Sequence, residues 1–337
     1  MARPPAPIRW LGALLGLGLG GGLVLLVGFL VFEQKVNAPG PNREPVIVQL
    51  DRGMGVRAIA RRLHEAGVIE QPALFVGLTR WQGAAAELKA GEYAFPAAVP
   101  AIEVLAMLRA GRVIQYRLTI PEGLTVAEAM ALIGADPVLT GDLPPPPGEG
   151  RLLPDTYFFT RGETRAALVA RMERALEREL ADAWEERAEG LPLDSADEAL
   201  ILASIIEKET GVAEERGVVA GVFVNRLRRG MRLQTDPTVI YALTRGVGPL
   251  GRELLRRDLD VDDPYNTYRF AGLPPGPIAL PGRASIRAAV DPERTDYLYF
   301  VADGTGGHAF ARTLQEHNRN VAQWRRIERE RVQRQGG

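Results

Sequence analysis

The 337-residue sequence contains no cysteine. This absence excludes disulfide bonds, thiolate catalysis and cysteine-ligated metal sites. Histidine is almost as scarce, because it occurs only at positions 64, 308 and 317. Three histidines so far apart do not indicate a histidine-rich metal centre. The sequence therefore predicts no bound metal.

Lysine is also rare, occurring only at positions 35, 89 and 208, so almost all positive charge is arginine. The formal net charge is −1, which gives no overall electrostatic reason to expect a nucleic-acid partner. The sequence lacks the G-x-x-x-x-G-K-[ST] loop that binds nucleotide phosphates and the G-x-S-x-G motif of serine hydrolases. With 46% hydrophobic and 25% charged residues, the chain is long enough to form two or three domains with a large core.

One long apolar run stands near the start of the chain. Residues 11–32 contain no charge, and such a run is long enough for a helix to cross a hydrocarbon core of about 30 Å. A cleaved signal peptide would have a shorter run and an A-x-A-like site. We therefore expect a retained transmembrane helix at 11–32, followed by a linker at 33–45. Arg3 and Arg9 place the preceding tail, residues 1–10, in the cytoplasm.

Two stretches repeat the order strand, glycine turn, helix. In the first, the alternating segment Val46–Leu50 precedes a helical pattern over Val56–Glu65. In the second, Tyr116–Ile120 precedes a helix over Thr125–Ile133, which opens with a capping box. This order resembles the LysM carbohydrate-binding module, although neither copy shows a full second helix with its strand. The sequence predicts a LysM-like subdomain at 46–135.

A helix buried inside a domain is predicted between Asp194 and Gly211. Ser195 followed three residues later by Glu198 is a capping box, and glycine is typical of a helix end. The residues between are apolar almost all the way round, as expected of a buried helix. The helix nevertheless ends in the charged sequence Glu-Lys-Glu at 207–209.

The two glutamates at this helix end differ in their neighbours. Three and four residues before Glu207 stand Ser204 and Ala203, whereas Glu209 follows two isoleucines at the same spacing. Small neighbours leave room for another group to lie against the Glu207 carboxylate. A helix end that emerges into solvent would explain both glutamates about as well. The pattern favours Glu207 as the functional carboxyl.

Polar and aromatic residues gather on proline- and glycine-rich loops downstream of this helix. Sugars offer hydroxyl groups for hydrogen bonds and C–H faces for aromatic rings, and stiff loops are more often binding walls than connectors. Each residue taken singly is better explained as an ordinary loop hydrogen bond. We predict that together they line a cleft for a polyhydroxylated ligand; they are Gln234, Asp236, Tyr265, Asn266, Thr267, Tyr268 and His308.

Cleavage of a glycosidic bond normally requires two carboxyl groups, of which the acid has a pKa raised by apolar surroundings. Glu207 follows six apolar or small residues and has such a setting. A second carboxylate is not obvious, since Glu209 points elsewhere on the helix and Asp236 is the nearest candidate by motif. One glutamate would suffice if a hydroxyl of the sugar were the nucleophile, because the same residue could act first as acid and then as base.

Six motifs in a fixed order resemble the YceG-like family. They are Ala-Ser-Ile-Ile-Glu-Lys-Glu-Thr at 203–210, Phe-Val-Asn-Arg-Leu at 223–227, Met-Arg-Leu-Gln-Thr-Asp-Pro-Thr-Val-Ile-Tyr at 231–241, Tyr-Asn-Thr-Tyr at 265–268, Gly-Leu-Pro-Pro-Gly-Pro-Ile at 272–278, and the glycine-rich segment 297–308. The resemblance implies an α+β protein with an N-terminal transmembrane helix, the LysM-like subdomain and a mixed α/β catalytic domain at 150–330.

The resemblance also implies an activity. Bacterial members of the family are endolytic peptidoglycan lytic transglycosylases, which cut nascent glycan strands at the MurNAc–GlcNAc bond and so end their elongation. Glu207 matches the family's catalytic glutamate. It would protonate the glycosidic oxygen and then take the proton from the MurNAc C6 hydroxyl, which leaves a 1,6-anhydroMurNAc end.

The implied location is the inner membrane. A single-pass anchor would leave the catalytic domain in the periplasm, or on the outer cell surface in bacteria without one. No metal or nucleotide cofactor is implied. Membrane anchoring limits the enzyme's reach to glycan near its site of synthesis, which makes peptidoglycan synthases candidate partners.

Three rival functions follow from the same residues. A hydrolytic muramidase would use water in place of the sugar hydroxyl, and a membrane-anchored peptidoglycan-binding scaffold would use the LysM-like units without catalysis. A serine peptidase of the cell wall is disfavoured, because Ser204 and Lys208 are four residues apart where the S-x-x-K signature needs three.

Overall fold

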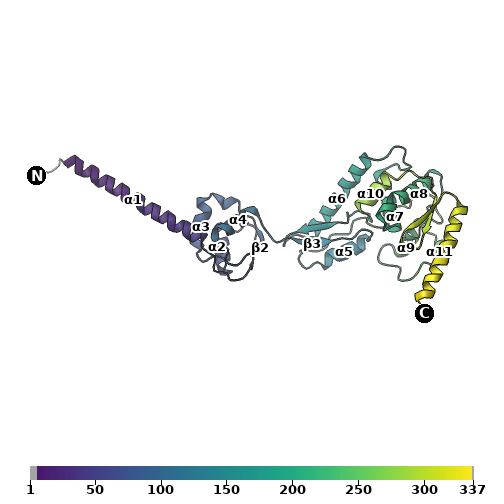
Figure 1. Ribbon diagram of the computed structural model, residues 1–337, viewed down its shortest axis with the longest axis horizontal. Coiled ribbons are helices and arrows are strands. Elements are labelled where there is room, and N and C mark those ends of the chain that lie inside the picture. Colours follow the sequence, from purple (N-terminus) through teal and green to yellow (C-terminus); the bar gives the residue numbers. More distant parts are fainter. Residues whose placement is uncertain (1–5, 336–337) are drawn as a thin grey trace. The chain divides into compact units, whose positions relative to one another are not determined.

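The computed structural model describes residues 6–335, which form helices and strands in the mixture expected of an α+β protein (Figure 1). The chain divides into two compact units. Unit 1 contains the described residues up to Tyr116 together with Phe159–Gly162. Unit 2 contains Arg117–Phe158 and the described residues from Glu163 onward.

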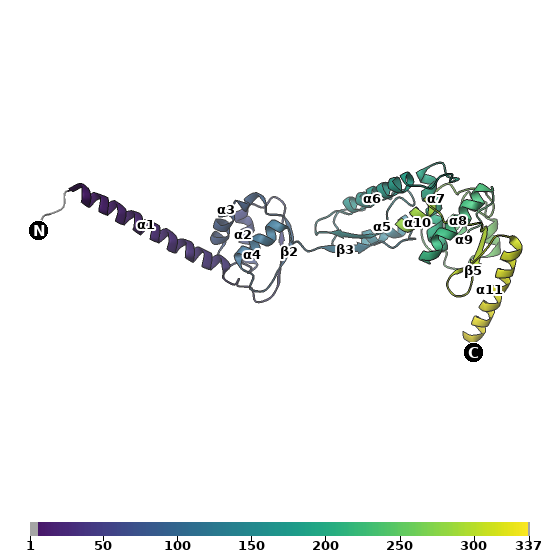
Figure 2. The same cartoon turned by 45° about the horizontal axis from the view of Figure 1, so that its top comes forward.

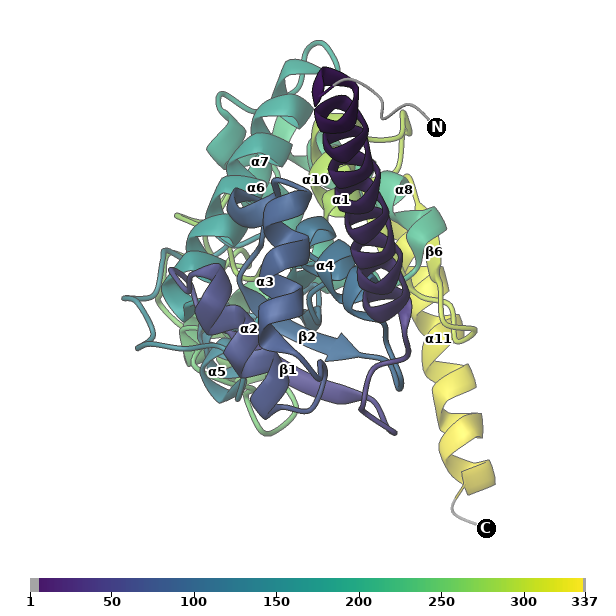
Figure 3. The same cartoon turned by 90° about the vertical axis from the view of Figure 1, so that its left-hand side faces the viewer.

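Unit 1 begins with one long helix and continues as strand, helix, helix, strand, helix. Its strands pair antiparallel, from Val46 opposite Phe95 to Leu50 opposite Gly91. The elements are α1 (Ala6–Asn37), β1 (Val46–Leu50), α2 (Val56–Glu65), α3 (Pro72–Trp81), the short 3-10 helix η1 (Ala84–Ala86), β2 (Gly91–Phe95) and α4 (Ala101–Ala110). Figure 3 shows α1 beside α3 and α4, and the two strands below them.

The core of unit 1 is filled by large side chains from each of these elements. Phe75 of α3 and Tyr93 of β2 are fully buried, as is Leu105 of α4. Val36, in the last turn of α1, is 1% exposed and belongs to the same core. The end of α1 is therefore part of the folded unit.

Helix α1 contains the predicted apolar run. By length and composition, its segment Gly20–Asn37 qualifies as a candidate membrane span. The helix continues through Asn37, so the first residues of the predicted linker at 33–45 are helical. It continues because Glu33–Asn37 contains neither proline nor glycine, and it ends before Pro39. Residues 1–5 of the predicted tail lie outside the described residues.

The two strand–turn–helix copies lie in different units. The first copy, β1 and α2, has the predicted bounds and is completed by α3 and β2. The second copy falls mainly in unit 2, so the predicted subdomain at 46–135 is not one compact unit. Its helix is followed by a proline-rich loop, not by a second helix. The LysM-like assignment remains a prediction.

Unit 2 is mainly helical. Its elements are β3 (Tyr116–Thr119), α5 (Val126–Ala135), β4 (Thr156–Phe159), α6 (Arg165–Glu185), α7 (Ala196–Glu209), η2 (Ala213–Glu215), α8 (Arg216–Arg228), α9 (Asp236–Thr244), η3 (Arg256–Asp260), α10 (Arg283–Val290), β5 (Tyr299–Ala302), β6 (His308–Ala311) and α11 (Leu314–Gln335). Strand β3 pairs with β4, and β5 forms an antiparallel hairpin with β6. Helix α11 lies against this hairpin (Figure 2).

Helix α7 lies at the centre of unit 2, packed against α6, α8, α9 and α10 (Figure 2). Eight consecutive residues, Ala199 to Ile206, are buried, which confirms the predicted buried helix. The Ser195 hydroxyl accepts a hydrogen bond from the Glu198 backbone N–H, as the capping pattern predicts. The Glu198 carboxylate accepts from the Asp194 N–H at 2.7 Å, one residue before the cap. Helix α7 is thereby fixed at its start and along its whole length.

Two glycines of α8 face the segment that leads to β5, and only one of them is required for its close packing. A Cβ at Gly221 would overlap the Glu293 carbonyl oxygen, whereas one at Gly217 would lie 3.4 Å from the Glu293 side chain. Backbone cannot move aside as a side chain can. We expect Gly221→Ala to destabilise the protein by about 1–3 kcal/mol through this overlap.

The matched control is Gly217→Ala. Alanine is the better helix former by about 1 kcal/mol, so this change should leave the melting temperature unchanged or raise it. Calorimetry of the two variants in detergent compares them directly. Equal melting temperatures would show that the segment at 293–295 is not held closely against α8.

Candidate active site

Two glutamates at the end of α7 face different surroundings. Residues two apart on a helix point to nearly opposite sides. Glu207 therefore faces the start of α10, and Glu209 faces the segment that precedes α9. Both side chains are partly buried. The helix end presents two separate carboxyl groups rather than a pair.

The Glu207 carboxylate caps α10. Its Oε2 accepts hydrogen bonds from the Gly282 backbone N–H at 3.0 Å and from the Ser285 hydroxyl at 2.7 Å. Gly282 is the N-cap residue of α10 and has no side chain of its own to satisfy the helix start. A carboxylate at this end is also stabilised by the helix dipole. Glu207 thus joins α7 to α10.

A second carboxyl group lies beside Glu207. The turn at Glu122-Gly123 packs here, since the Lys208 ammonium donates to the Gly123 carbonyl at 3.1 Å and the Gly123 N–H donates to the Leu280 carbonyl at 2.8 Å. A Cβ on Gly282 would overlap the Glu122 carboxylate. Burial raises the pKa of Glu122, and the nearby charge of Glu207 raises it further.

The small residues before Glu207 are covered by the protein itself. The Ser204 hydroxyl accepts a hydrogen bond from the Ile278 N–H at 3.0 Å and donates to the Ile201 carbonyl at 2.7 Å. Ser204 is fully buried. The space that the sequence reserves beside Glu207 is therefore occupied by the segment leading from Ile278 to Gly282.

Glu209 instead opens into a pocket of about 460 Å³. Its Oε1 accepts a hydrogen bond from the Thr235 hydroxyl. Thr235 is itself fixed, because its N–H donates to the Thr267 hydroxyl at 3.1 Å. The carboxyl group is therefore held by one donor on its buried side while the pocket lies in front of it.

The pocket raises the proton affinity of Glu209. Burial raises the pKa of Glu209 to about 7, the Thr235 hydrogen bond opposes this shift, and the charge of Asp236 adds to it. A carboxyl group with a pKa near neutrality is present in both protonation states at physiological pH, as a general acid and base must be. This property was expected of Glu207 and is found at Glu209.

Three of the predicted ligand-binding residues line the same pocket. Gln234, Asp236 and Tyr268 border it together with Glu209. The Tyr268 hydroxyl donates to Asp236 Oδ1 at 2.6 Å. Burial is the main cause of the raised pKa of Tyr268, and the Asp236 carboxylate raises it further. Gln234 holds a left-handed backbone with φ 51°, which costs about 1–2 kcal/mol for a residue with a Cβ. Strain of this kind is typical of functional sites.

The pocket also contains residues that the sequence did not identify as candidates. These are Arg226, Leu233, Tyr299, Phe300, Val301, Leu314 and His317. The Tyr299 and His317 rings stack with centroids 5.2 Å apart. Burial lowers the pKa of His317, which favours its neutral form. Aromatic rings beside polar groups suit a sugar ring.

Arg226 supplies a buried positive charge next to Glu209. Its Nε donates to the Leu298 carbonyl at 2.6 Å, and its Nη1 donates to the carbonyls of Arg232 and Leu233 at 3.2 and 2.8 Å. Burial lowers the pKa of Arg226. Because carbonyl oxygens satisfy the guanidinium, its charge persists in the core and limits the rise of the Glu209 pKa.

Three other predicted residues support the pocket from outside. Asn266 is fully buried and donates to the carbonyls of Leu259 and Val261 at 2.9 and 2.8 Å. Thr267 is 1% exposed, and its carbonyl accepts from the Gln234 N–H at 3.2 Å. The Tyr265 ring packs against Tyr241, with centroids 4.8 Å apart, outside the pocket lining. Asn266 and Thr267 act as loop anchors.

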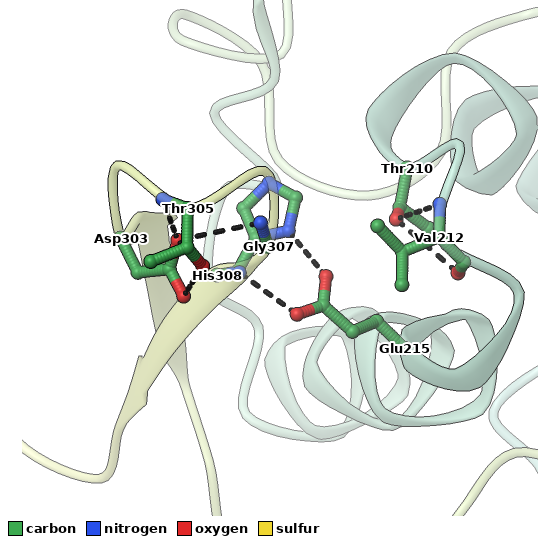
Figure 4. A network of polar contacts seen from close by, with 7 residues as sticks. All are labelled: Thr210, Val212, Glu215, Asp303, Thr305, Gly307 and His308. Carbon is green, nitrogen blue, oxygen red and sulfur yellow. Dashed lines mark hydrogen bonds and ion pairs between the residues drawn. The ribbon is translucent and has the colours of Figure 1, made fainter.

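His308 is also held by protein partners. Its Nδ1 lies 2.6 Å from Glu215 Oε2, and its backbone N–H donates to Glu215 Oε1 at 2.8 Å (Figure 4). Figure 4 shows Glu215 between His308 and the turn at Thr210–Val212 that follows α7. Gly307 leaves room for this contact, because a Cβ there would lie 2.6 Å from Glu215 Oε1 and would displace that carboxylate. His308 thus ties the β5–β6 turn to η2, directly before α8.

Known proteins resemble this chain over most of its length. A sequence model described as the YceG-like family matches residues 48–323. The endolytic murein transglycosylase of Bacillus subtilis (strain 168) is 30% identical over 309 residues, which cover 82% of this chain and 84% of that protein. A protein of the same name from Streptococcus pneumoniae (strain D39) is 29% identical, and the match covers 88% of this chain and 64% of the pneumococcal protein.

A solved structure is similar as well. The crystal structure of a YceG-like protein from Listeria monocytogenes matches with a TM-score of 0.51 and 31% sequence identity. The match covers 82% of this chain and 98% of that chain.

The pKa of Glu209 predicts a pH-dependent stability. The folded protein retains the Glu209 proton up to about pH 7, whereas the unfolded chain releases it near the ordinary glutamate pKa of 4.5. The folded state binds more protons in this window, so the contribution of Glu209 to stability falls as pH rises through it. We expect Glu209→Gln to gain stability relative to wild type with rising pH, by at most about 3 kcal/mol.

Two substitutions next to Glu209 test whether its raised pKa causes this pH dependence. Thr235→Val removes the hydrogen bond that lowers the pKa and should move the window to higher pH, while Asp236→Asn should move it to lower pH. Urea unfolding of the variants across the pH range measures these shifts. A stability difference between Glu209→Gln and wild type that does not change with pH would contradict the assignment.

Proposed function

The chain belongs to the YceG-like family, and on that premise we propose that it is an endolytic lytic transglycosylase of peptidoglycan. It cleaves the MurNAc–GlcNAc bond within glycan strands and leaves 1,6-anhydroMurNAc ends, which stops further elongation of the strand. Two relatives at about the same identity carry the name endolytic murein transglycosylase. The pocket at the end of α7 supports the same activity by its chemistry.

Glu209 is the residue that we propose as the catalytic acid and base. The observation that carries this proposal is that a carboxyl group with a pKa of about 7 lies at a polar and aromatic pocket. Proton transfer from a positioned acid contributes roughly 10²–10⁴-fold to such reactions. Asp236 and Tyr268 form the facing wall and are proposed to bind the sugar with Gln234.

The reaction proceeds in two proton transfers. Protonated Glu209 gives its proton to the glycosidic oxygen as the bond from that oxygen to MurNAc C1 breaks, and the released strand carries the new hydroxyl. The Glu209 carboxylate then takes the proton of the MurNAc C6 hydroxyl while O6 bonds to C1. Glu209 is protonated again at the end, so one carboxyl group suffices.

The sequence motif predicts Glu207 as the catalytic glutamate. Its surroundings support that role less than those of Glu209 do. Its Oε2 already accepts two hydrogen bonds that hold α10. The nearby Glu122 would provide the second carboxyl group that a Glu207 mechanism lacks in the sequence. We propose that Glu207 positions the end of α7, and thereby Glu209, through its contact with α10.

A hydrolytic muramidase is the second candidate. Asp236 lines the pocket with Glu209, and a second carboxylate is the group that activates water in hydrolysis. Asp236 Oδ1 is bonded to the Tyr268 hydroxyl, which favours a binding role. The products distinguish the two, because water leaves a reducing end and the C6 hydroxyl leaves an anhydro end.

We propose that α1 anchors the enzyme in the inner membrane by a single pass. The tail carrying Arg3 and Arg9 lies in the cytoplasm and the catalytic domain faces the periplasm, or the outer surface in bacteria without one. An anchored enzyme reaches glycan close to the membrane, where strands are made. Peptidoglycan synthases are its proposed neighbours, and failure to crosslink with any synthase in cells would contradict that.

Exchange of each glutamate for glutamine separates the two catalytic assignments. We expect Glu209→Gln to lower the rate of glycan cleavage by roughly 10²–10⁴-fold while leaving strand binding intact. Glu207→Gln should retain most of the cleavage rate but lower the melting temperature, because it weakens the cap of α10. Full-length protein digests purified glycan strands, and mass spectrometry counts anhydro and reducing ends.

The outcomes are distinct. Loss of cleavage in a stably folded Glu207→Gln variant, with Glu209→Gln active, would assign catalysis to Glu207. Reducing ends in place of anhydro ends would replace the transglycosylase with the muramidase. Full cleavage by both variants would remove this helix end from the mechanism.

A further inference from the structure

Helix α1 enters unit 1 without a break. It runs as one helix from Ala6 to Asn37, and its last turn contributes Val36 to the core of unit 1. Phe32 packs against the same core. A membrane span built from α1 is therefore rigidly continuous with unit 1, with no flexible linker between them.

Helix α3 lies beside α1 (Figure 3), and Trp81 is the last residue of α3. Its ring meets Phe29 edge-on at 5.9 Å between centroids and Phe32 at 6.0 Å. Trp81 is nevertheless 61% exposed. One face of this large apolar side chain rests on α1, and the rest has no cover within unit 1.

The depth of Trp81 follows from the position of its contacts in the span. A hydrocarbon core of about 30 Å takes about 20 helical residues, and the uncharged run of α1 ends at Glu33. Phe29 and Phe32 therefore occupy the last turn inside the hydrocarbon. A side chain that touches both lies at the level where hydrocarbon gives way to headgroups. Tryptophan is enriched at this level, because its ring is apolar and its N–H needs a hydrogen-bond acceptor.

The chain next to Trp81 suits the same environment. Residues 82–86 are Gln-Gly-Ala-Ala-Ala and carry no charge. Ala85 and Ala86 are exposed. Small uncharged residues allow close approach to a lipid surface without the cost of removing a charge from water.

We propose that unit 1 sits directly on the outer surface of the lipid bilayer, with the Trp81 indole in the interfacial layer beside the end of the span. The proposal rests on the proposed membrane anchor. The occupant of the exposed Trp81 face is lipid, because Trp81 packs against Phe29, which is itself exposed on the proposed span. Unit 1 thereby contacts the bilayer at two points, the end of α1 and the Trp81 side chain.

Single-tryptophan variants of the full-length protein test this placement. The chain has four tryptophans, Trp10, Trp81, Trp184 and Trp324, and exchange of three for phenylalanine leaves one reporter. Each variant is reconstituted in vesicles of phosphatidylcholine brominated either near the headgroup end or near the methyl end of the acyl chains. We expect Trp81 fluorescence to fall about twofold with bromine near the headgroup and much less with bromine at the bilayer centre.

The matched control is Trp184, which lies on α6 in unit 2. Its fluorescence should not respond to brominated lipid. Conversely, Trp81→Phe in the otherwise natural chain should remove a component of the quenching that the wild-type protein shows near the headgroups. This reverse variant keeps the test valid if a triple substitution fails to fold.

Trp10 distinguishes a failure of the interfacial placement of Trp81 from a failure of the membrane anchor. Lipid quenching of Trp10 without any quenching of Trp81, combined with quenching of Trp81 by aqueous iodide, would overturn the interfacial placement and leave the anchor intact. Absence of lipid quenching at both Trp10 and Trp81 would overturn the anchor, and this proposal with it.

Discussion

The two-residue spacing of Glu207 and Glu209 on one helix determines what each carboxyl group can do. Helical geometry turns them to different sides of α7. One side faces the start of α10, where a carboxylate satisfies backbone and hydroxyl donors. The other faces a pocket where burial favours the protonated form. A single helix end thus combines a carboxylate that anchors α10 with a carboxyl group of raised pKa, which we propose as the catalytic group.

The reactive side is balanced between opposing charges. Asp236 increases the proton affinity of Glu209, while Arg226 and His308 reduce it. Arg226 keeps its charge in the core because three carbonyl groups hold it. The Thr235 hydrogen bond lowers the pKa of Glu209 more than either positive charge does. The resulting pKa of about 7 is the property on which the proposed acid and base role of Glu209 rests.

Local features could be predicted from the sequence, whereas the surroundings of Glu207 and Glu209 could not. The bounds of α2 and the capping box at Thr125 follow from short-range patterns and are found as predicted. The choice between Glu207 and Glu209 depends on which distant segment packs against each. The small residues before Glu207 indicate that another group packs closely against this face of the helix. That group is the chain's own segment at 278–282. The pocket residues that the sequence did not identify, such as Arg226 and His317, come together only in the fold.

The continuity of α1 with unit 1 also bears on how the protein is made and truncated. Val36 is part of the core, so unit 1 cannot finish folding until the last turn of α1 has packed in place. A soluble fragment that starts after Asn37 would leave an unfilled space at Val36, which weakens a core. Fragments meant to retain unit 1 should therefore keep the final turns of α1, including Phe32.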